Sequence, residues 1–203
     1  NKPVIVLEVG GIKRGTTWKV GINGINRDAF FGDARNNSRR SDLLNLRLKP
    51  WRTDGEYILL CGQHDKSQQW NLLPSMDRWV SETIQSIRSY TDRPIIFRPH
   101  PRCPVAKVES KFKNIMRQHP QQTPGTYDDF DINFDNVYCT VSWTSNPGIH
   151  SVIEGVPSYT SPSSLAWPVS IKSLTNLENP PLVDTLQWLN DYAYTEWTTE
   201  EIR

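Results

Sequence analysis

Short apolar runs alternate with helix-like segments along the middle of this chain. Four runs of mainly aliphatic or β-branched residues are expected to form strands: residues 3–9, 55–62, 94–97 and 137–141. Apolar side chains recur at helical spacing in three segments: residues 75–90, 107–118 and 147–154. Because strands and helices alternate between residues 56 and 159, the pattern predicts a parallel sheet with helices on both faces. The predicted fold class is therefore α/β with a Rossmann-like sheet.

The pattern divides the chain into three predicted parts. Residues 1–52 hold the first strand, a glycine-rich segment and a basic loop, residues 53–180 form the Rossmann-like domain, and residues 181–203 form a helical tail. With 203 residues the chain can bury one good core and a small second lobe. It begins at Asn1 rather than at a methionine and stops within a helical pattern at Arg203, which indicates truncation or processing.

A serine-rich turn follows the strand at 137–141 and leads into the helix at 147–154. Pro147 suits the start of a helix, and Ser145 or Asn146 suits its cap. The free amides of a first helical turn, with the helix dipole behind them, form a site for an anion. The polar side chains expected at that site are Ser142, Thr144, Ser145 and Asn146. An ordinary strand–turn–helix capped by serines is the alternative interpretation.

The strand at 94–97 also ends in residues that suit an anion. Arg98 and Arg102 offer fixed positive forks for phosphate. His100 lies between two prolines, so its backbone is stiffened, and its ring can donate to a phosphate or transfer a proton. Since ligands of α/β proteins bind beyond the carboxyl ends of parallel strands, the two blocks together predict a phosphorylated or nucleotide-bearing ligand. A structural role for His100 is the alternative.

These two blocks resemble the nucleotide-binding half of GT-B-fold glycosyltransferases. Similar elements occur in bacterial sialyl-, Kdo- and teichoic-acid-polymerising transferases and in UDP-GlcNAc 2-epimerases. The matching positions are Arg98, His100, Pro101, Ser142, Thr144, Ser145, Glu154, Gly155 and Pro157, within about 65 of the 203 residues. The resemblance implies that His100 contacts the nucleotide phosphate, that residues 142–146 contact phosphate or ribose, and that Glu154 contacts a ribose hydroxyl. Trp143 and the Asn146–Pro147 pair depart from the small residues usual in this turn.

Other residues are candidates for the rest of the site. The glycine-rich segment at 10–15 is either a tight hairpin turn or a ligand loop, in which Gly11, Lys13 and Arg14 would take part. Its spacing matches neither a Walker nor a dinucleotide fingerprint. Tryptophan faces suit sugars and bases, and Trp143 and Trp167 are the candidates for stacking. The candidates for a catalytic base are Asp65, Glu8 and His150, with His64 and Asp65 also expected near the sugar.

Charge and cysteine content limit the classes of partner. The net charge is +1, but residues 27–52 carry seven cations, including Arg35 and Arg40, against three acids. That stretch is either a solvated loop or a loop that becomes ordered when it binds an anion, nucleic acid included.

No metal site is predicted, since the three cysteines lack metal-like spacing and Asp129–Phe130–Asp131 is expected in a surface loop. No apolar run reaches the length of a membrane span, and we expect a soluble, cytoplasmic protein.

These observations predict a metal-independent glycosyltransferase, without a cofactor, that moves a sugar from a nucleotide-sugar to an acceptor hydroxyl. The acceptor is a glycan or a modified DNA base, as in bacteriophage enzymes that glycosylate their own DNA. A nucleotide-sugar epimerase is the nearest enzymatic alternative, because it shares the same half-domain. A non-catalytic module that binds nucleotide or sugar phosphate is the alternative from another class, and a homodimer is one way of completing the cleft.

Overall fold

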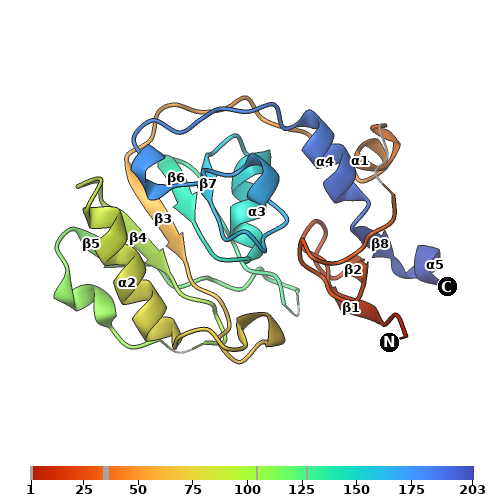
Figure 1. Ribbon diagram of the computed structural model, residues 1–203, viewed down its shortest axis with the longest axis horizontal. Coiled ribbons are helices and arrows are strands. Elements are labelled where there is room, and N and C mark those ends of the chain that lie inside the picture. Colours follow the sequence, from red (N-terminus) through yellow and green to blue (C-terminus); the bar gives the residue numbers. More distant parts are fainter. Residues whose placement is uncertain (1, 34–36, 104, 127) are drawn as a thin grey trace.

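The computed structural model describes residues 2–33, 37–103, 105–126 and 128–203, and it contains two sheets (Figure 1). The larger is a five-stranded parallel sheet with strand order β5-β4-β3-β6-β7. Its strands are β3 (Tyr57–Cys61), β4 (Ile95–Arg98), β5 (Ile115–Arg117), β6 (Val137–Val141) and β7 (Ser158–Tyr159). The parallel α/β fold predicted from the sequence is confirmed.

Helix α2 (Met76–Arg88) covers one face of this sheet. It begins as expected at Ser75, whose Oγ accepts a hydrogen bond from the Arg78 amide at 3.4 Å. Its apolar stripe, which includes Val80 and Ile84, is buried in the same core as Ile58 and Phe97 of the strands. A smaller apolar cluster around Leu59, Val137 and Val156 is separate from that core.

Helix α3 (Asn146–Ile153) follows β6 and lies beside β6 and β7 (Figure 1). It ends before Gly155, whose φ of +73° provides the left-handed conformation that terminates a helix. Its buried side chains Ile149 and Val152 pack with Trp188 of α4 (Leu186–Ala193). The sequence therefore located α2, α3 and the strands that precede them, with differences of one or two residues at their ends.

The smaller sheet is antiparallel and joins the two ends of the chain. It has the order β1-β2-β8, with β1 (Ile5–Val9), β2 (Thr17–Ile22) and β8 (Glu196–Thr198). Figure 1 shows both termini beside it, with α1 (Arg39–Leu43), α4 and α5 (Thr199–Ile202) nearby. The segments 1–52 and 181–203, predicted as separate parts, thus contribute to one sheet.

The buried Arg40 of α1 links α1 to the C-terminal segment of the chain. Its guanidinium donates to the backbone oxygens of Ala193 and Glu196 at 3.0 Å and to both carboxylate oxygens of Glu201 at 2.8 Å. It also lies 3.9 Å from the centroid of the Trp197 ring. One cation of the basic stretch 27–52 is therefore a structural anchor.

Other described cations of that stretch are paired as well. Arg47 bonds Asp42 at 3.0 Å, Lys49 pairs with Glu154, and Arg27 donates to the Pro162 carbonyl at 3.0 Å. Arg35 lies outside the described residues. Among the residues that the structure describes, no helix is long and apolar enough to cross a membrane.

One predicted helix, at 107–118, is wrong. The segment forms a short 3-10 turn, η2 (Val108–Lys111), followed by β5, which pairs with β4 at the edge of the sheet. Asn114 has a φ of +57°, which no helix interior accommodates. Three further 3-10 turns are η1 (Gln68–Trp70), η3 (Trp167–Val169) and η4 (Leu174–Asn176).

Candidate functional site

A cleft of about 890 Å³ lies between the carboxyl ends of the parallel strands and the small sheet. One wall consists of the segments that follow β3, β4 and β6, together with the start of α3. The other wall consists of β1, β2 and the glycine-rich turn between them. Because the carboxyl ends of parallel strands meet at one edge of a sheet, loops distant in sequence converge here.

Two histidines face each other across adjacent strand ends. The rings of His64, after β3, and His100, after β4, have centroids 5.3 Å apart in an edge-to-face arrangement. The Nδ1 atom of His100 accepts the Arg102 amide at 3.1 Å, and Nδ1 of His64 accepts the Lys66 amide at 3.1 Å. Since Nδ1 is an acceptor in both, each neutral ring carries its hydrogen on Nε2.

The environment of His100 keeps it neutral. Burial lowers the pKa of His100 to about 4, with smaller contributions from His64, Arg102 and Arg14, which all disfavour a further positive charge. At neutral pH, His100 is therefore a fixed Nε2–H donor in the cleft. Such a group suits a hydrogen bond to a phosphate oxygen and is poorly suited to donating a proton from a charged ring.

The start of α3 offers a second set of donors, although a smaller one than expected. Ser145 is the N-cap, and its buried Oγ has no partner in the described structure. Pro147 is the second helical residue and has no amide hydrogen, and the Gly148 amide bonds the Ser145 carbonyl at 3.1 Å. Within the described residues, the Asn146 amide bonds no acceptor. The site at α3 thus rests on Ser145 and Asn146.

Thr144 lies in the same wall but is held by other residues. The side-chain oxygen of Gln63, after β3, accepts from the Thr144 amide at 3.1 Å and from its hydroxyl at 2.9 Å. Both residues are buried. Thr144 therefore fixes the turn before α3 against the end of β3, and Gln63 is a positioning residue that the sequence did not single out.

The glycine-rich turn joins β1 to β2 in an antiparallel hairpin, one of its two interpretations, and it reaches the start of α3. A Cβ atom on Gly11 would lie 2.7 Å from Cγ of Asn146, so a larger residue at this position would displace the Asn146 side chain. The Nε2 atom of His150 lies 2.6 Å from the Gly11 carbonyl, and its ring is thereby engaged. Gly11, Lys13 and Arg14 all line the cleft.

The buried carboxylate of Glu196 holds this turn in place. It accepts hydrogen bonds from the amides of Gly11 at 2.7 Å and Ile12 at 2.9 Å, from the Thr17 hydroxyl at 2.7 Å and from the Tyr192 hydroxyl at 3.2 Å. Glu196 lies in β8, 185 residues from Gly11. The sequence pattern predicted a helical tail at 181–203, so the role of Glu196 in holding the glycine-rich turn was not predicted.

An acidic loop neutralises the cations of the cleft. Asp128 pairs with both Arg14 and Arg102, and the Arg98 guanidinium donates to the Asp131 carbonyl and lies 3.7 Å from its carboxylate. Asp128, Asp129 and Asp131 all line the cleft. The loop expected at the surface is therefore part of the site. Arg98 and Arg102 are present as predicted, but each already has a carboxylate partner.

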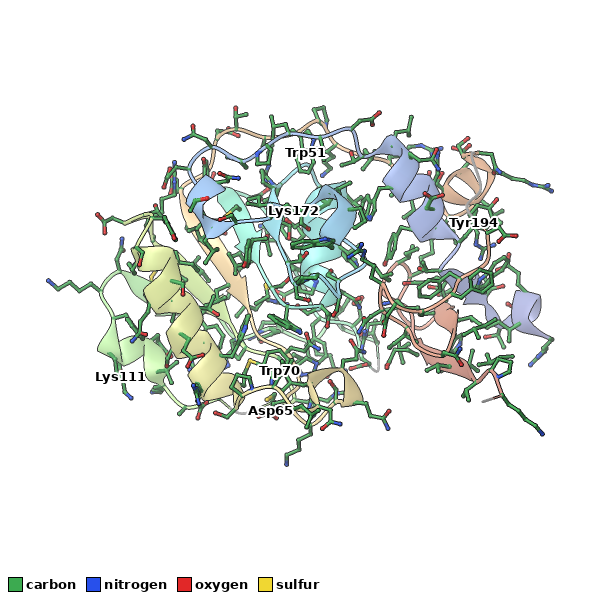
Figure 2. All side chains as sticks on the ribbon, viewed as in Figure 1. Trp51, Asp65, Trp70, Lys111, Lys172 and Tyr194 are labelled. Carbon is green, nitrogen blue, oxygen red and sulfur yellow. The ribbon has the colours of Figure 1, made fainter. Side chains whose placement is uncertain are left out.

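Five of the predicted site residues lie outside the cleft lining. Asp65 accepts from the Cys103 thiol at 3.3 Å, and Figure 2 shows it at the lower edge of the molecule. Ser142 is buried beneath Gly148, and Glu154 pairs with Lys49 near the end of α3. Trp143 packs edge-to-face on Trp70 at 5.9 Å, and the Lys172 ammonium covers the Trp167 ring at 4.2 Å.

The remaining predicted residues do converge. The cleft is lined by Arg98, His100, Arg102, Thr144, Ser145 and Asn146 from the parallel sheet and by Glu8, Gly11, Lys13 and Arg14 from the hairpin, with His150 from α3. Sequence reasoning missed Lys19, which also lines the cleft although it is buried. Within the described ranges, no three histidine, cysteine or acidic side chains are grouped as a metal site requires.

Comparisons with known proteins support the fold. No protein-family model matches the chain, and no curated protein matches its sequence. The structure is similar to that of KpsC from Thermosulfurimonas dismutans, described as a β-Kdo 2,7 transferase, with a TM-score of 0.51 and 17% sequence identity. The match covers 94% of this chain and 68% of that chain. At this identity the similarity concerns the α/β fold alone.

Proposed function

We propose that the protein is a glycosyltransferase that transfers a sugar from a nucleotide-sugar to an acceptor hydroxyl. The observation that carries the proposal is the position of His100, a neutral Nε2–H donor in the same cleft as the unpartnered Ser145 hydroxyl and the Asn146 amide. Donors of this kind stabilise the negative charge that develops on a departing phosphate. The glycosyltransferase-like fold is consistent with this reaction.

In the proposed reaction the nucleotide phosphate binds between His100 and the start of α3. The acceptor oxygen forms a bond to the sugar carbon as the bond between that carbon and the phosphate oxygen breaks. The phosphate oxygen takes the electron pair and is stabilised by the His100 Nε2–H and the helix dipole. Arg14 and Arg102 lie beside this position and pair with Asp128. The bound phosphate would replace the Asp128 carboxylate as their partner. These groups would do the work of a divalent cation, so we expect transfer to persist in the presence of a chelator.

We propose Glu8 as the base that takes the proton of the acceptor hydroxyl. Of the three sequence candidates, Asp65 lies outside the cleft lining and His150 is engaged with the Gly11 carbonyl. Glu8 is exposed on β1 and lines the wall opposite His100. Asp129 is the other cleft carboxylate for which no ion pair is seen among the described residues, so it is the comparison residue for mutation.

The first experiment is a thermal-shift screen against UDP, GDP, CMP, ADP and their sugar conjugates. A ligand that binds only the folded state raises the melting temperature, so a shift with one nucleotide identifies the donor class. Release of that nucleotide from its sugar conjugate, in the presence of acceptor glycans or modified DNA, then tests transfer. Glu8→Gln should abolish release while leaving donor affinity unchanged, and Asp129→Asn should retain release.

The screen also separates the alternatives. Binding of a nucleotide without release of sugar, with every acceptor tested, would favour a non-catalytic binding module. Conversion of the sugar while it remains attached to the nucleotide would favour an epimerase. Failure of every nucleotide to bind would overturn the proposed function.

A further inference from the structure

The small sheet has a polar face and an apolar face. Along β2, Thr17 and Lys19 are buried, whereas Trp18 between them is 40% exposed. Lys19 lines the cleft, as does its partner in register, Glu8 of β1. Because alternate residues of a strand point to opposite faces, the polar face is turned toward the cleft and the face that carries Trp18 is turned away from it.

Strand pairing assembles the outward face from three segments. Leu7 of β1 lies opposite Val20 of β2, and Ile5 lies opposite Ile22. On the other side of β2, Ile22 forms an antiparallel bridge with Phe30. Residues that lie opposite each other on antiparallel strands share one face of the sheet, and so do alternate residues of one strand. Six apolar side chains therefore make up this outward surface, which we call the apolar face: Ile5, Leu7, Trp18, Val20, Ile22 and Phe30.

The apolar face is open to solvent. Ile5 is 70% exposed, and Leu7 and Phe30 are each 52% exposed. The small sheet lies at one end of the molecule, beside both termini (Figure 1). At roughly 200 Å² for a large apolar side chain, these three residues and Trp18 together expose about 400 Å². Contiguous apolar patches of several hundred Å² are often interaction surfaces.

We propose that the apolar face binds the same face of a second copy of this chain, so that the two small sheets pack face to face in a two-fold dimer. Sheets with apolar faces pack about 10 Å apart, with their side chains interdigitating, as in a β-sandwich. An identical sheet has the same extent and the same twist, so aligned strands stay in contact along their length. None of the six residues is charged, so the face does not select a partner by charge. The net charge is +1 per chain, so two copies repel each other little.

The area of the apolar face fits a homodimer. Two copies would bury about 800 Å² of exposed apolar surface, and apolar atoms make up about 65% of a homodimer interface. The complete interface would therefore bury about 1,200 Å², which is the lower end of the range for specific, stable complexes. Because interfaces of modest area reach micromolar dissociation constants, we expect the dimer to form at micromolar concentrations.

The dimer would leave the cleft open. Glu8 and Lys19 line the cleft, on the opposite side of the sheet from Leu7 and Trp18. The second copy is thus expected to support the wall that carries Glu8 rather than to complete the cleft. Dimer formation is therefore independent of the proposed function.

Sedimentation velocity at protein concentrations from about 1 to 100 μM tests for the dimer. The wild type should change over this range from one chain of 23.4 kDa to two. Leu7→Glu should weaken the dimer at least tenfold, because the interface would have to bury an unpaired carboxylate. Leu72→Glu places the same charge at a leucine that is 97% exposed and lies outside the apolar face, so it should dimerise as the wild type does.

Cross-linking tests the symmetry of the contact in a variant that adds no charge. Val20 lies between Trp18 and Ile22 on β2 and opposite Leu7, so it is central in the apolar face. Residues at the centre of a two-fold interface contact their own copies. A short bismaleimide should therefore link two chains of Val20→Cys but not two chains of Met116→Cys, whose position is exposed on β5. The three native cysteines are buried and should not react.

Three results would overturn the inference. The first is a wild type that stays monomeric at about 100 μM. The second is a dimer formed by Leu7→Glu whose fold is intact by circular dichroism, or equal cross-linking of Val20→Cys and Met116→Cys, since either would place the contact on another surface. The third is sedimentation of monomeric wild type with vesicles of anionic lipid, lost in Leu7→Glu, which would assign the apolar face to a membrane.

Discussion

His100 is the residue on which the chemistry of the site depends most. Its Nδ1 accepts a backbone amide, and burial keeps the ring neutral, so this cleft residue carries a single ring hydrogen, on Nε2. The sequence predicted this residue and its phosphate role from the Pro–His–Pro setting. Its neutrality depends first on burial and then on His64, Arg102 and Arg14. Of these residues, His64 and Arg14 come from other parts of the chain and could not be placed by local pattern.

We predict that His100 titrates near pH 4 in the free protein, far below the ordinary value of 6.5. Its folded-state pKa is lowered, so the unfolded chain takes up this proton first as the pH falls. The corresponding stability is present above about pH 6.5 and is lost between 6.5 and 4. A bound phosphate should raise the pKa of His100, because an anion favours the charged ring. NMR titration of the imidazole resonances measures both values, and an unchanged pKa on binding would contradict the assignment.

Asp128 should weaken the binding of anions, since it occupies two cations of the cleft. We predict that Asp128→Asn raises the affinity for inorganic phosphate about three- to tenfold, because Arg14 and Arg102 lose their competing partner. Asp54→Asn makes the same charge change at an exposed position outside the cleft and should leave the affinity unaltered. Calorimetric titration provides the comparison, and equal or weaker binding by Asp128→Asn would contradict a competing role.

At the scale of elements, local patterns located the site-bearing strands and helices but not the edge of the sheet. Helix α2 has a serine cap and an apolar stripe, and α3 has a proline in its first turn and a glycine after its end. These features act locally, so sequence reasoning found both helices. The segment 107–118 has helix-like composition, yet the pairing of Ile115 and Arg117 with β4 decides its structure. Strand β8 was missed for the same reason, because its three residues gain their structure from pairing with β2.

Helix α5 and helix α1 are joined by an ion pair whose strength should depend on pH. The hydrogen bond from Arg40 lowers the pKa of Glu201 to about 2 from an ordinary value of 4.5. Since the folded-state pKa is lowered, the contribution to stability is complete above pH 4.5 and is lost as the pH falls toward 2. We predict that Glu201→Gln destabilises the protein at pH 7 and that the difference from wild type disappears near pH 2.

Urea unfolding at the two pH values measures this difference. Glu200→Gln is the matched control, because Glu200 lies in the same first helical turn and its carboxylate is exposed. A Glu201→Gln variant as stable as wild type at pH 7 would show that the pair does not hold the end of the chain.

At the scale of the whole molecule, the site exists only because distant segments meet. Arg14 and Asp128 are 114 residues apart, and Gly11 and Glu196 are 185 apart. The sequence predicted a phosphate-binding half from two contiguous blocks, each of which can be recognised by itself. The opposing wall, with its buried Lys19 and Glu196, forms because the two ends of the chain pair in one sheet. That pairing could not be predicted from any local sequence pattern.

The most direct test of the central claim is a calorimetric titration with the nucleotide identified by the thermal-shift screen. His100→Ala should lower the affinity by about tenfold or more through loss of a charge-assisted hydrogen bond, with the fold intact. His119→Ala, at an exposed histidine outside the cleft, should bind as the wild type does. Undiminished affinity in His100→Ala would contradict the proposal that the phosphate binds between His100 and the start of α3.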